Sequence, residues 1–518
     1  MSQCHQTALI CANTVNPQAG DVCTFMSTLE QLNFCNSFAE LPEIFFSEHQ
    51  PKPLNNDFLI HFNDSVAKLI GLDKSEAARE DFLDICTTRK NLAGFKPIAM
   101  CYAGHQFGHF VPRLGDGRAI LLAQLRDENK LPWDLQLKGA GPTLYSRGSD
   151  GRAVLRSSIR EYLCSAAMHG LNIPTTHALF LSGSDEEIYR EQIEPGAMVM
   201  RVAPSHIRFG SFEYYFYAQR YDDLQRLLDY VLQQYFPQLL EHENPCQAFL
   251  NEVVISTAEM IAQWQAAGFA HGVMNTDNMS IHGITLDYGP FGFVEQFDPH
   301  YICNHSDHQG RYAFNKQPEI GLFNLSCLAQ ALLPLLHENT DKAVELAKQS
   351  LDKYQPAFVH YYADLMRQKL GFAEQHDDDQ KLLTDLLKLL ENDRVDYTLF
   401  FRNLSCQFSE EDLPLCRDLF LDRTAFDGWF DRYQARLRQE NSTAKTRCAQ
   451  MKQVNPKYIL RNYMAEIAIR KAQDENDYSE IENLMNILQN PFDEHPAFAH
   501  YAGHPPQWAQ QIEVSCSS

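Results

Sequence analysis

The pattern of apolar and polar positions changes along the chain. From about residue 95 to 215, short apolar runs alternate with glycines and arginines, which is typical of strands joined by tight turns. Beyond about residue 220, apolar residues recur at helical spacing, as in the leucines of 382–390 and again over about 456–489. The pattern predicts an α+β protein in which a mixed smaller lobe precedes a larger, mainly helical lobe.

Two segments predict helices that bear on function. Val254, Ala258 and Ile261 share one face of a helix that we expect to open at residues 251–252 and to end at Gly268. Leucines, an isoleucine and a tyrosine at helical spacing over residues 155–163 predict a second helix after Asp150 and Gly151. This second helix follows a glycine-rich connection, and it carries one of the acidic residues considered below.

Composition narrows the class of protein. The chain of 518 residues has 44 Lys and Arg against 67 Asp and Glu, a formal net charge of −23, which argues against nucleic-acid binding because phosphates need a basic face. No apolar run approaches the ~18 residues of a membrane span, and the first residues carry no basic leader. The 14 cysteines form no CxxC pairs, which favours a reducing compartment. We therefore expect an acidic protein of the cytoplasm.

The stretch 113–163 holds the first candidate chemistry. Gly115 and Gly117 form a turn before an apolar run, where backbone amides can approach a phosphate closely, and Arg118 adds a positive charge. A glycine turn of this kind is more often a plain β-hairpin turn. By itself it is therefore a weak signal.

A lysine and a glutamate strengthen that signal. Lys138 ends an alternating segment that predicts a strand, and Glu161 lies on the helix predicted after Asp150 and Gly151. Kinase-like enzymes hold nucleotide phosphates with a strand lysine that is oriented by a helix glutamate. Each residue taken alone also fits a solvated surface position.

A second stretch, 268–294, supplies oxygen ligands. Asp277-Asn278 and Asp287 flank an apolar run that predicts a short hairpin, which would bring an amide oxygen and two carboxylates to one end. Such hard ligands suit Mg²⁺ that bridges nucleotide phosphates. The alternative is that Asp277 and Asn278 merely cap turns.

The spacing departs from that of protein kinases at one position. Kinases place the catalytic aspartate five residues before the metal-binding asparagine. Counting back from Asn278 gives Val273, which cannot accept a proton. The nearest carboxylate able to serve is Asp277, so ordinary kinase catalysis is disfavoured.

Taken together, these motifs resemble the selenoprotein O family, also called YdiU. The resemblance runs from about residue 40 to the C-terminus and rests on YAGHQFGHFVPRLGDGRAILL, QLKGAGPTLYSRGSDGRAVLRSSIREYL, the segment HGVMNTDNMSI with GITLDYGPFGF, and CNHSDHQGRYAFNKQP. It implies a protein-kinase-like two-lobed fold. It also implies transfer of AMP from ATP to Ser, Thr or Tyr hydroxyls of proteins, with the nucleotide reversed in the cleft.

The resemblance also implies roles for residues of this chain. Asp277 matches the general base, and Asn278 and Asp287 match ligands of Mg²⁺ or Mn²⁺. The positions that match the nucleotide-binding set are Gly115, Gly117, Arg118, Lys138, Asp150, Gly151, Glu161, Arg201, Arg208 and Asp287. The expected organisation is an extension over 1–35, an N-lobe over 36–210, a C-lobe over 211–490 and a tail over 491–518.

Two rival functions remain open on the sequence. One is a phosphotransferase that moves the γ-phosphate, which Val273 disfavours; the other is an inactive nucleotide-binding scaffold, which the complete phosphate and metal set disfavours. We expect protein substrates and no nucleic-acid or membrane partner. The oligomeric state, the protein substrates and the preferred metal are left open.

Histidines and cysteines offer further hypotheses. The segment 300–308 has residue types of a zinc site, but its spacing is compressed, so packing or substrate contact is the better interpretation. His105 and His109 are interpreted as core or turn histidines. Cys516 matches the place where selenocysteine-containing relatives carry that residue, and it could form a reversible disulfide with an internal thiol such as Cys303.

Overall fold

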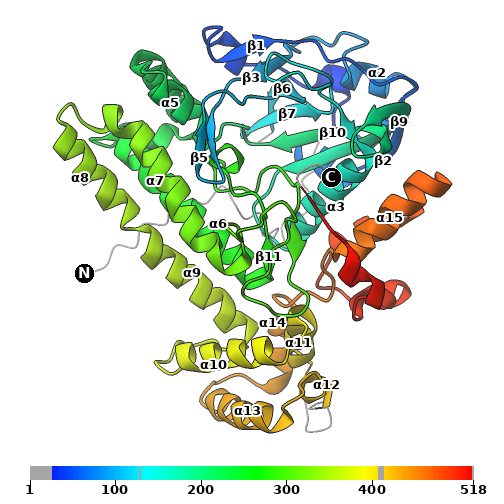
Figure 1. Ribbon diagram of the computed structural model, residues 1–518, viewed down its shortest axis with the longest axis vertical. Coiled ribbons are helices and arrows are strands. Elements are labelled where there is room, and N and C mark those ends of the chain that lie inside the picture. The colour runs from blue at the N-terminus through cyan, green and yellow to red at the C-terminus, as the bar shows by residue number, and fades with distance from the viewer. Residues whose placement is uncertain (1–25, 128–129, 407–413, 516–518) are drawn as a thin grey trace.

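A large antiparallel sheet occupies one end of the molecule (Figure 1). The computed structural model describes residues 26–127, 130–406 and 414–515. The sheet has the order β1-β3-β6-β7-β10-β9-β2, with β8 paired to β10. Its strands are β1 Phe46–Glu48, β2 Phe58–Phe62, β3 Ile98–Met100, β6 Ala119–Arg126, β7 Pro132–Lys138, β8 Ala153–Val154, β9 His177–Tyr189 and β10 Ile193–Ala203.

The central strand β7 carries the lysine predicted from the sequence. Lys138 pairs with Ala119 of β6 on one side and with Val199 of β10 on the other. Alternate residues of a strand point to opposite faces. Leu135 and Leu137 join an apolar cluster on one face, so Lys138 lies on the opposite face.

The helix α3 (Leu155–Gly170) covers β9 and β10, and it includes the apolar residues whose helical spacing predicted it. Helices α15 (Asn462–Glu475) and α16 (Ser479–Leu488), from the far end of the chain, also pack against α3. The expected single helical segment over 456–489 is therefore divided, because Asn476 adopts a left-handed conformation between the two helices.

Helices make up most of the chain after β10 (Figure 1). The helix α6 is central among them, and α7, α8 and α9 pack against it. The helices are α4 Phe209–Tyr217, α5 Tyr221–Tyr235, α6 Pro245–Ala267, α7 Gln317–Leu336, α8 Thr340–Leu351, α9 Tyr354–Lys369, α10 Asp379–Asn392, α11 Tyr397–Leu404, α12 Pro414–Arg417, α13 Arg423–Leu437 and α14 Ala444–Lys452. Two shorter helices, α1 Asp64–Leu69 and α2 Phe82–Cys86, lie between β2 and β3 in the sequence. The α+β prediction is confirmed at this level, and the division into lobes and tails stays a prediction.

The N-terminus of α6 lies earlier than the sequence pattern predicted. The Asn244 side chain accepts a hydrogen bond from the Gln247 N–H, and Pro245 occupies the first turn. An asparagine cap followed by proline is a strong start signal, and the apolar periodicity that pointed to residue 251 overlooked it. The predicted end is confirmed, because Gly268 caps the helix with φ of 74°.

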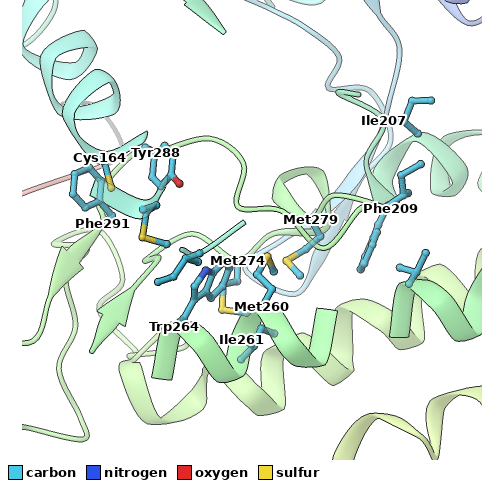
Figure 2. Packing of buried hydrophobic residues seen from close by; sticks show 14 of the residues in the cluster. Cys164, Ile207, Phe209, Met260, Ile261, Trp264, Met274, Met279, Tyr288 and Phe291 are labelled. Carbon is cyan, nitrogen blue, oxygen red and sulfur yellow. The ribbon is translucent and has the colours of Figure 1, made fainter. Parts of the chain in front are cut away.

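Beneath the second candidate stretch lies an apolar cluster. Figure 2 shows Met274 and Met279 near Met260, Ile261 and Trp264 of α6, all within one buried cluster. The Trp264 indole N–H donates to Thr285 Oγ1 at 3.0 Å, so its polar atom is satisfied. Segment 274–279 is therefore anchored on α6.

One helix, Phe314–Leu336, is long and apolar enough by length and composition to cross a membrane. Of its most apolar window, 56% is buried inside the protein. The helix α7, which forms most of it, packs against α4, α6 and α8. The apolar side chains of this helix thus pack in the protein core.

Candidate active site

A cavity of about 510 Å³ lies where the sheet meets the helical part. Its walls bring together residues that are up to 188 positions apart in the sequence, from Tyr102 to Pro290. The predicted site residues that line it are Gly115, Gly117, Arg118, Lys138, Arg201, Arg208, Asp277, Asn278 and Asp287.

Three predicted residues do not line this cavity. Glu161 lies directly behind Lys138, buried on α3. Asp150 forms a partly exposed ion pair with Arg190 at 2.8 Å, although its neighbour Ser149 does reach the cavity. Gly151 has φ of 65° and no room for a Cβ atom, which fixes a tight connection before α3.

The lysine–glutamate pair predicted from the sequence is present. Lys138 Nζ donates to Glu161 Oε2, and both side chains are buried. The other oxygen of Glu161 accepts from Arg201 Nε at 2.5 Å. One carboxylate therefore orients two cations toward the cavity.

Asp287 lies at the other end of this charged network. Its Oδ1 is 2.5 Å from Arg201 Nη2, and its Oδ2 is 2.8 Å from Arg208 Nη1. The residue adopts φ of 59°, a conformation uncommon for residues other than glycine and often found at functional sites. The order of contacts is Lys138, Glu161, Arg201, Asp287, Arg208.

Burial and charge set the pKa values of this network. Burial lowers the pKa of Lys138 to about 8, and the Glu161 charge offsets part of that effect. Burial alone would raise the pKa of Asp287, but Arg201 and Arg208 hold that pKa well below its usual value. Asp287 is thus ionised at neutral pH and can serve as a ligand for a cation.

Asp277 lies on a short 3₁₀ turn, η5 (Thr276–Asn278), at the cavity wall. Arg208 Nη1 donates to its backbone carbonyl at 2.7 Å, which ties this turn to Asp287. Its Oδ2 accepts from Gln106 Nε2 at 3.2 Å, and its Oδ1 is buried without a partner among the described residues. Burial raises the pKa of Asp277 to about 7.

The donor set fits a hard divalent cation. Asn278 donates through Nδ2 to the Val273 carbonyl at 3.0 Å, so its amide oxygen remains as a ligand atom beside the Asp287 carboxylate. The predicted hairpin between them is reduced to a single bridge, Met279 to Thr285. The asparagine and both carboxylates nevertheless lie in one cavity, as that prediction required.

Gly115 and Gly117 lie in the irregular segment before β6, where the structure shows a steric reason for glycine that the sequence did not reveal. A Cβ atom at Gly115, which has φ of 77°, would lie 2.3 Å from the Tyr145 ring. One at Gly117 would lie 2.9 Å from the Tyr145 carbonyl oxygen. These glycines therefore let the segment around Tyr145 close over the strand end, and both remain on the cavity wall.

Sequence reasoning missed Asp116, which lies between these glycines. Its buried carboxylate accepts from the Met100 N–H, the Tyr102 hydroxyl and Gln136 Nε2 at 3.1 to 3.2 Å. Gln136 in turn accepts from Arg201 at 3.2 Å, and burial raises the pKa of Asp116. The sequence signal that could have identified Asp116 is a carboxylate placed between the two glycines, in the triplet Gly-Asp-Gly.

The other histidine and cysteine hypotheses have separate outcomes. In segment 300–308, His305 faces Glu513 while the Cys303 thiol donates to the Ala270 carbonyl, so the described side chains do not converge on one point. His105 lies on a hairpin and bonds to a buried glutamate, as expected of a turn histidine. Cys516 and most of the predicted N-terminal extension lie outside the described residues.

Comparison with known proteins identifies relatives over nearly the whole chain. A family model described as protein adenylyltransferase SelO matches residues 28–489. A protein nucleotidyltransferase YdiU from Thiobacillus denitrificans is 53% identical over 496 residues, which cover 95% of this chain and 100% of that protein. Proteins of the same name from Thioalkalivibrio sulfidiphilus and Myxococcus xanthus are each 51% identical, with the same coverage.

Proposed function

The chain belongs to the SelO family of protein adenylyltransferases, also named YdiU, and on that premise we propose that its cavity transfers AMP from ATP to Ser, Thr or Tyr hydroxyls of proteins. The observation that carries the proposal is the convergence of three cations with an asparagine and two carboxylates on one cavity: Lys138, Arg201, Arg208, Asn278, Asp277 and Asp287. These three cations face a cavity of about 510 Å³ in a protein with a formal net charge of −23. We further propose that the overall fold is protein-kinase-like.

The cations would bind the phosphates of ATP. Lys138 is oriented by Glu161, and the guanidinium groups of Arg201 and Arg208 can each offer two N–H donors in a plane. Pairing with Asp287 holds both guanidinium groups at the cavity wall while no phosphate is bound. Such preorganised cations stabilise charge that develops on phosphate oxygens.

Asn278 and Asp287 would hold a divalent cation, Mg²⁺ or Mn²⁺. When bound, such an ion would neutralise negative charge on the phosphates. Because both oxygens of Asp287 contact arginines here, a bound ion would share or replace these contacts. The arginines would then be free to turn toward the phosphates.

Asp277 would act as the general base. Its raised pKa leaves a carboxylate that accepts a proton readily near neutral pH. As the substrate hydroxyl oxygen forms a bond to the α-phosphorus, its proton passes to Asp277, and the bond to the β-phosphate bridging oxygen breaks to release pyrophosphate. This assignment requires the reversed nucleotide that the family resemblance implies, with the α-phosphate nearest Asp277.

Position-specific labelling tests the function directly. Incubation of the protein and an acceptor such as casein with ATP labelled at the α-phosphate should label protein, and ATP labelled at the γ-phosphate should not. Asp287→Ala and Asp277→Ala should each abolish α-labelling while the fold is retained, which circular dichroism and a cooperative melting transition establish. Transfer of the γ-label would instead support a phosphotransferase, and melting shifts with ATP but no label from either position would support a scaffold.

A further inference from the structure

A two-stranded hairpin lies against the turn that carries Asp277. Its strands are β4 (Gly104–Gln106) and β5 (His109–Val111). Three successive hairpin residues bond to the turn: the His105 N–H to Thr276 Oγ1 at 2.6 Å, Gln106 Nε2 to Asp277 Oδ2 at 3.2 Å, and the Phe107 N–H to the Asn275 side chain at 3.3 Å. The hairpin therefore contacts the turn at each of residues 275–277.

The tip of the hairpin is held in a strained conformation by these contacts. Phe107 and Gly108 have φ of 49° and 83°, as a two-residue hairpin loop of type I′ requires, although a bulky residue rarely adopts such a φ. The Phe107 N–H also donates to Tyr312 Oη at 3.0 Å, which further restrains the tip. The Tyr312 hydroxyl in turn donates to Asn275 at 2.6 Å.

Buried groups fasten the other side of the hairpin. Glu213 of α4 is fully buried; it accepts from the Thr276 hydroxyl and from His105 Nδ1. The His105 backbone N–H also donates to the Thr276 hydroxyl oxygen. Because a buried carboxylate without partners is costly, these bonds hold the hairpin and the turn in one arrangement.

The two oxygens of Asp277 have different surroundings. Oδ1 is buried without a hydrogen bond among the described residues, and it lies so close to Gly104 that a Cβ atom there would be 2.7 Å away. Oδ2 accepts from Gln106, and both residues line the cavity. Oδ2 is therefore the oxygen that can meet a substrate hydroxyl.

We propose that Gln106 is a positioning residue for AMP transfer, which holds Asp277 Oδ2 toward the acceptor hydroxyl by donating its side-chain amide hydrogen to that oxygen. This inference rests on the proposed role of Asp277 as general base. Gln106 keeps the carboxylate in one rotamer and leaves a lone pair of Oδ2 for the incoming proton. It acts through Asp277 and not by contact with the reacting atoms.

The test compares steady-state kinetics of pyrophosphate release with casein as acceptor. Gln106→Met keeps the length of the side chain and removes the donor, so kcat should fall about tenfold or more, as for a hydrogen bond to a charged group, while KM for ATP stays unchanged. His109→Gln, on the exposed side of the same hairpin, is the matched control and should keep the wild-type kcat. Melting temperatures establish that each variant is folded.

A double variant separates this inference from the proposed function. Asp277→Asn should lose transfer, and adding Gln106→Met to Asp277→Asn should lower the residual rate no further. Transfer at the wild-type rate by Asp277→Asn would overturn the general base itself. If Asp277→Asn is inactive but Gln106→Met has the wild-type kcat, or changes KM for ATP alone, the positioning role is overturned and the proposed function stands.

Discussion

Arg201 Nη2 lies 2.5 Å from Asp287 Oδ1, so a proposed phosphate ligand and a proposed metal ligand neutralise each other within the protein. Arg201 simultaneously holds Glu161, which orients Lys138. The two halves of the site, phosphate cations and metal carboxylate, are thus one continuous network. A substitution at one residue of this network should therefore alter the contacts of the other residues.

Arg201→Met should destabilise the protein as well as inactivate it. Arg201 is 5% exposed, and its removal leaves Glu161 with a single partner and Asp287 with Arg208 alone. Breaking a buried ion pair costs about 3–5 kcal/mol. Urea unfolding of Arg201→Met should show a loss of this order, whereas Arg432→Met, which breaks an exposed pair with Asp385, should change stability by about 0–1 kcal/mol. Equal effects of both would show that the Arg201 network adds no stability.

Asp287→Asn should separate nucleotide binding from catalysis. The neutral amide no longer competes for Arg201 and Arg208, so both guanidinium groups become available to phosphates. In the presence of a chelator, the variant should bind a fluorescent ATP analogue more tightly than the wild type, by about tenfold, yet fail to transfer AMP when Mg²⁺ or Mn²⁺ is restored. Weaker binding by the variant without metal would contradict the proposed competition. The change Arg432→Met again serves as a control with unaltered binding.

Gly104→Ala should displace the general base without straining the backbone. Gly104 lies in β4 and does not have a positive φ, but an added Cβ would lie 2.7 Å from Asp277 Oδ1 and 2.9 Å from its Cβ. The carboxylate must move, and a shift of about 1 Å can lower the rate ~100-fold. Gly428→Ala on α13, where a Cβ meets nothing within 4 Å, is the matched control. Wild-type kcat in folded Gly104→Ala would show that Asp277 tolerates displacement.

Local periodicity was enough to predict one half of the site. Lys138 at the end of an alternating strand and Glu161 on an amphipathic helix are in contact as expected, because strand and helix periods fix which face each residue occupies. The same reasoning placed Asp277, Asn278 and Asp287 together, although no hairpin ladder connects them.

Long-range contacts could not be predicted in this way. Gln106 and Asp277 are 171 positions apart, and no periodicity in either segment indicates that they meet. Arg201 and Arg208 entered only through the family resemblance, since an arginine after a strand is ordinarily a surface residue. The structure buries both side chains. Their burial follows from the register of the sheet and from the carboxylates that accept their hydrogen bonds.

Lys369, the last residue of α9, should make stability depend on pH. It is 6% exposed, its Nζ lies 4.5 Å from the Phe401 ring centre and 5.4 Å from that of Tyr397, and among the described residues no carboxylate pairs with it. Burial lowers its pKa from 10.5 to about 7.

Between these two pH values the unfolded chain holds a proton on Lys369 that the folded protein has released, so raising the pH favours the folded state. The wild type should therefore gain stability relative to Lys369→Met from pH 7 to 9.5, by at most about 1.4 kcal/mol per pH unit. Urea unfolding of both proteins at intervals across that range measures the difference, with the exposed Lys388→Met as control. The Lys388 variant should follow the wild type at every pH. Parallel curves for the wild type and Lys369→Met would mean that Lys369 keeps its proton when folded, held by the two rings.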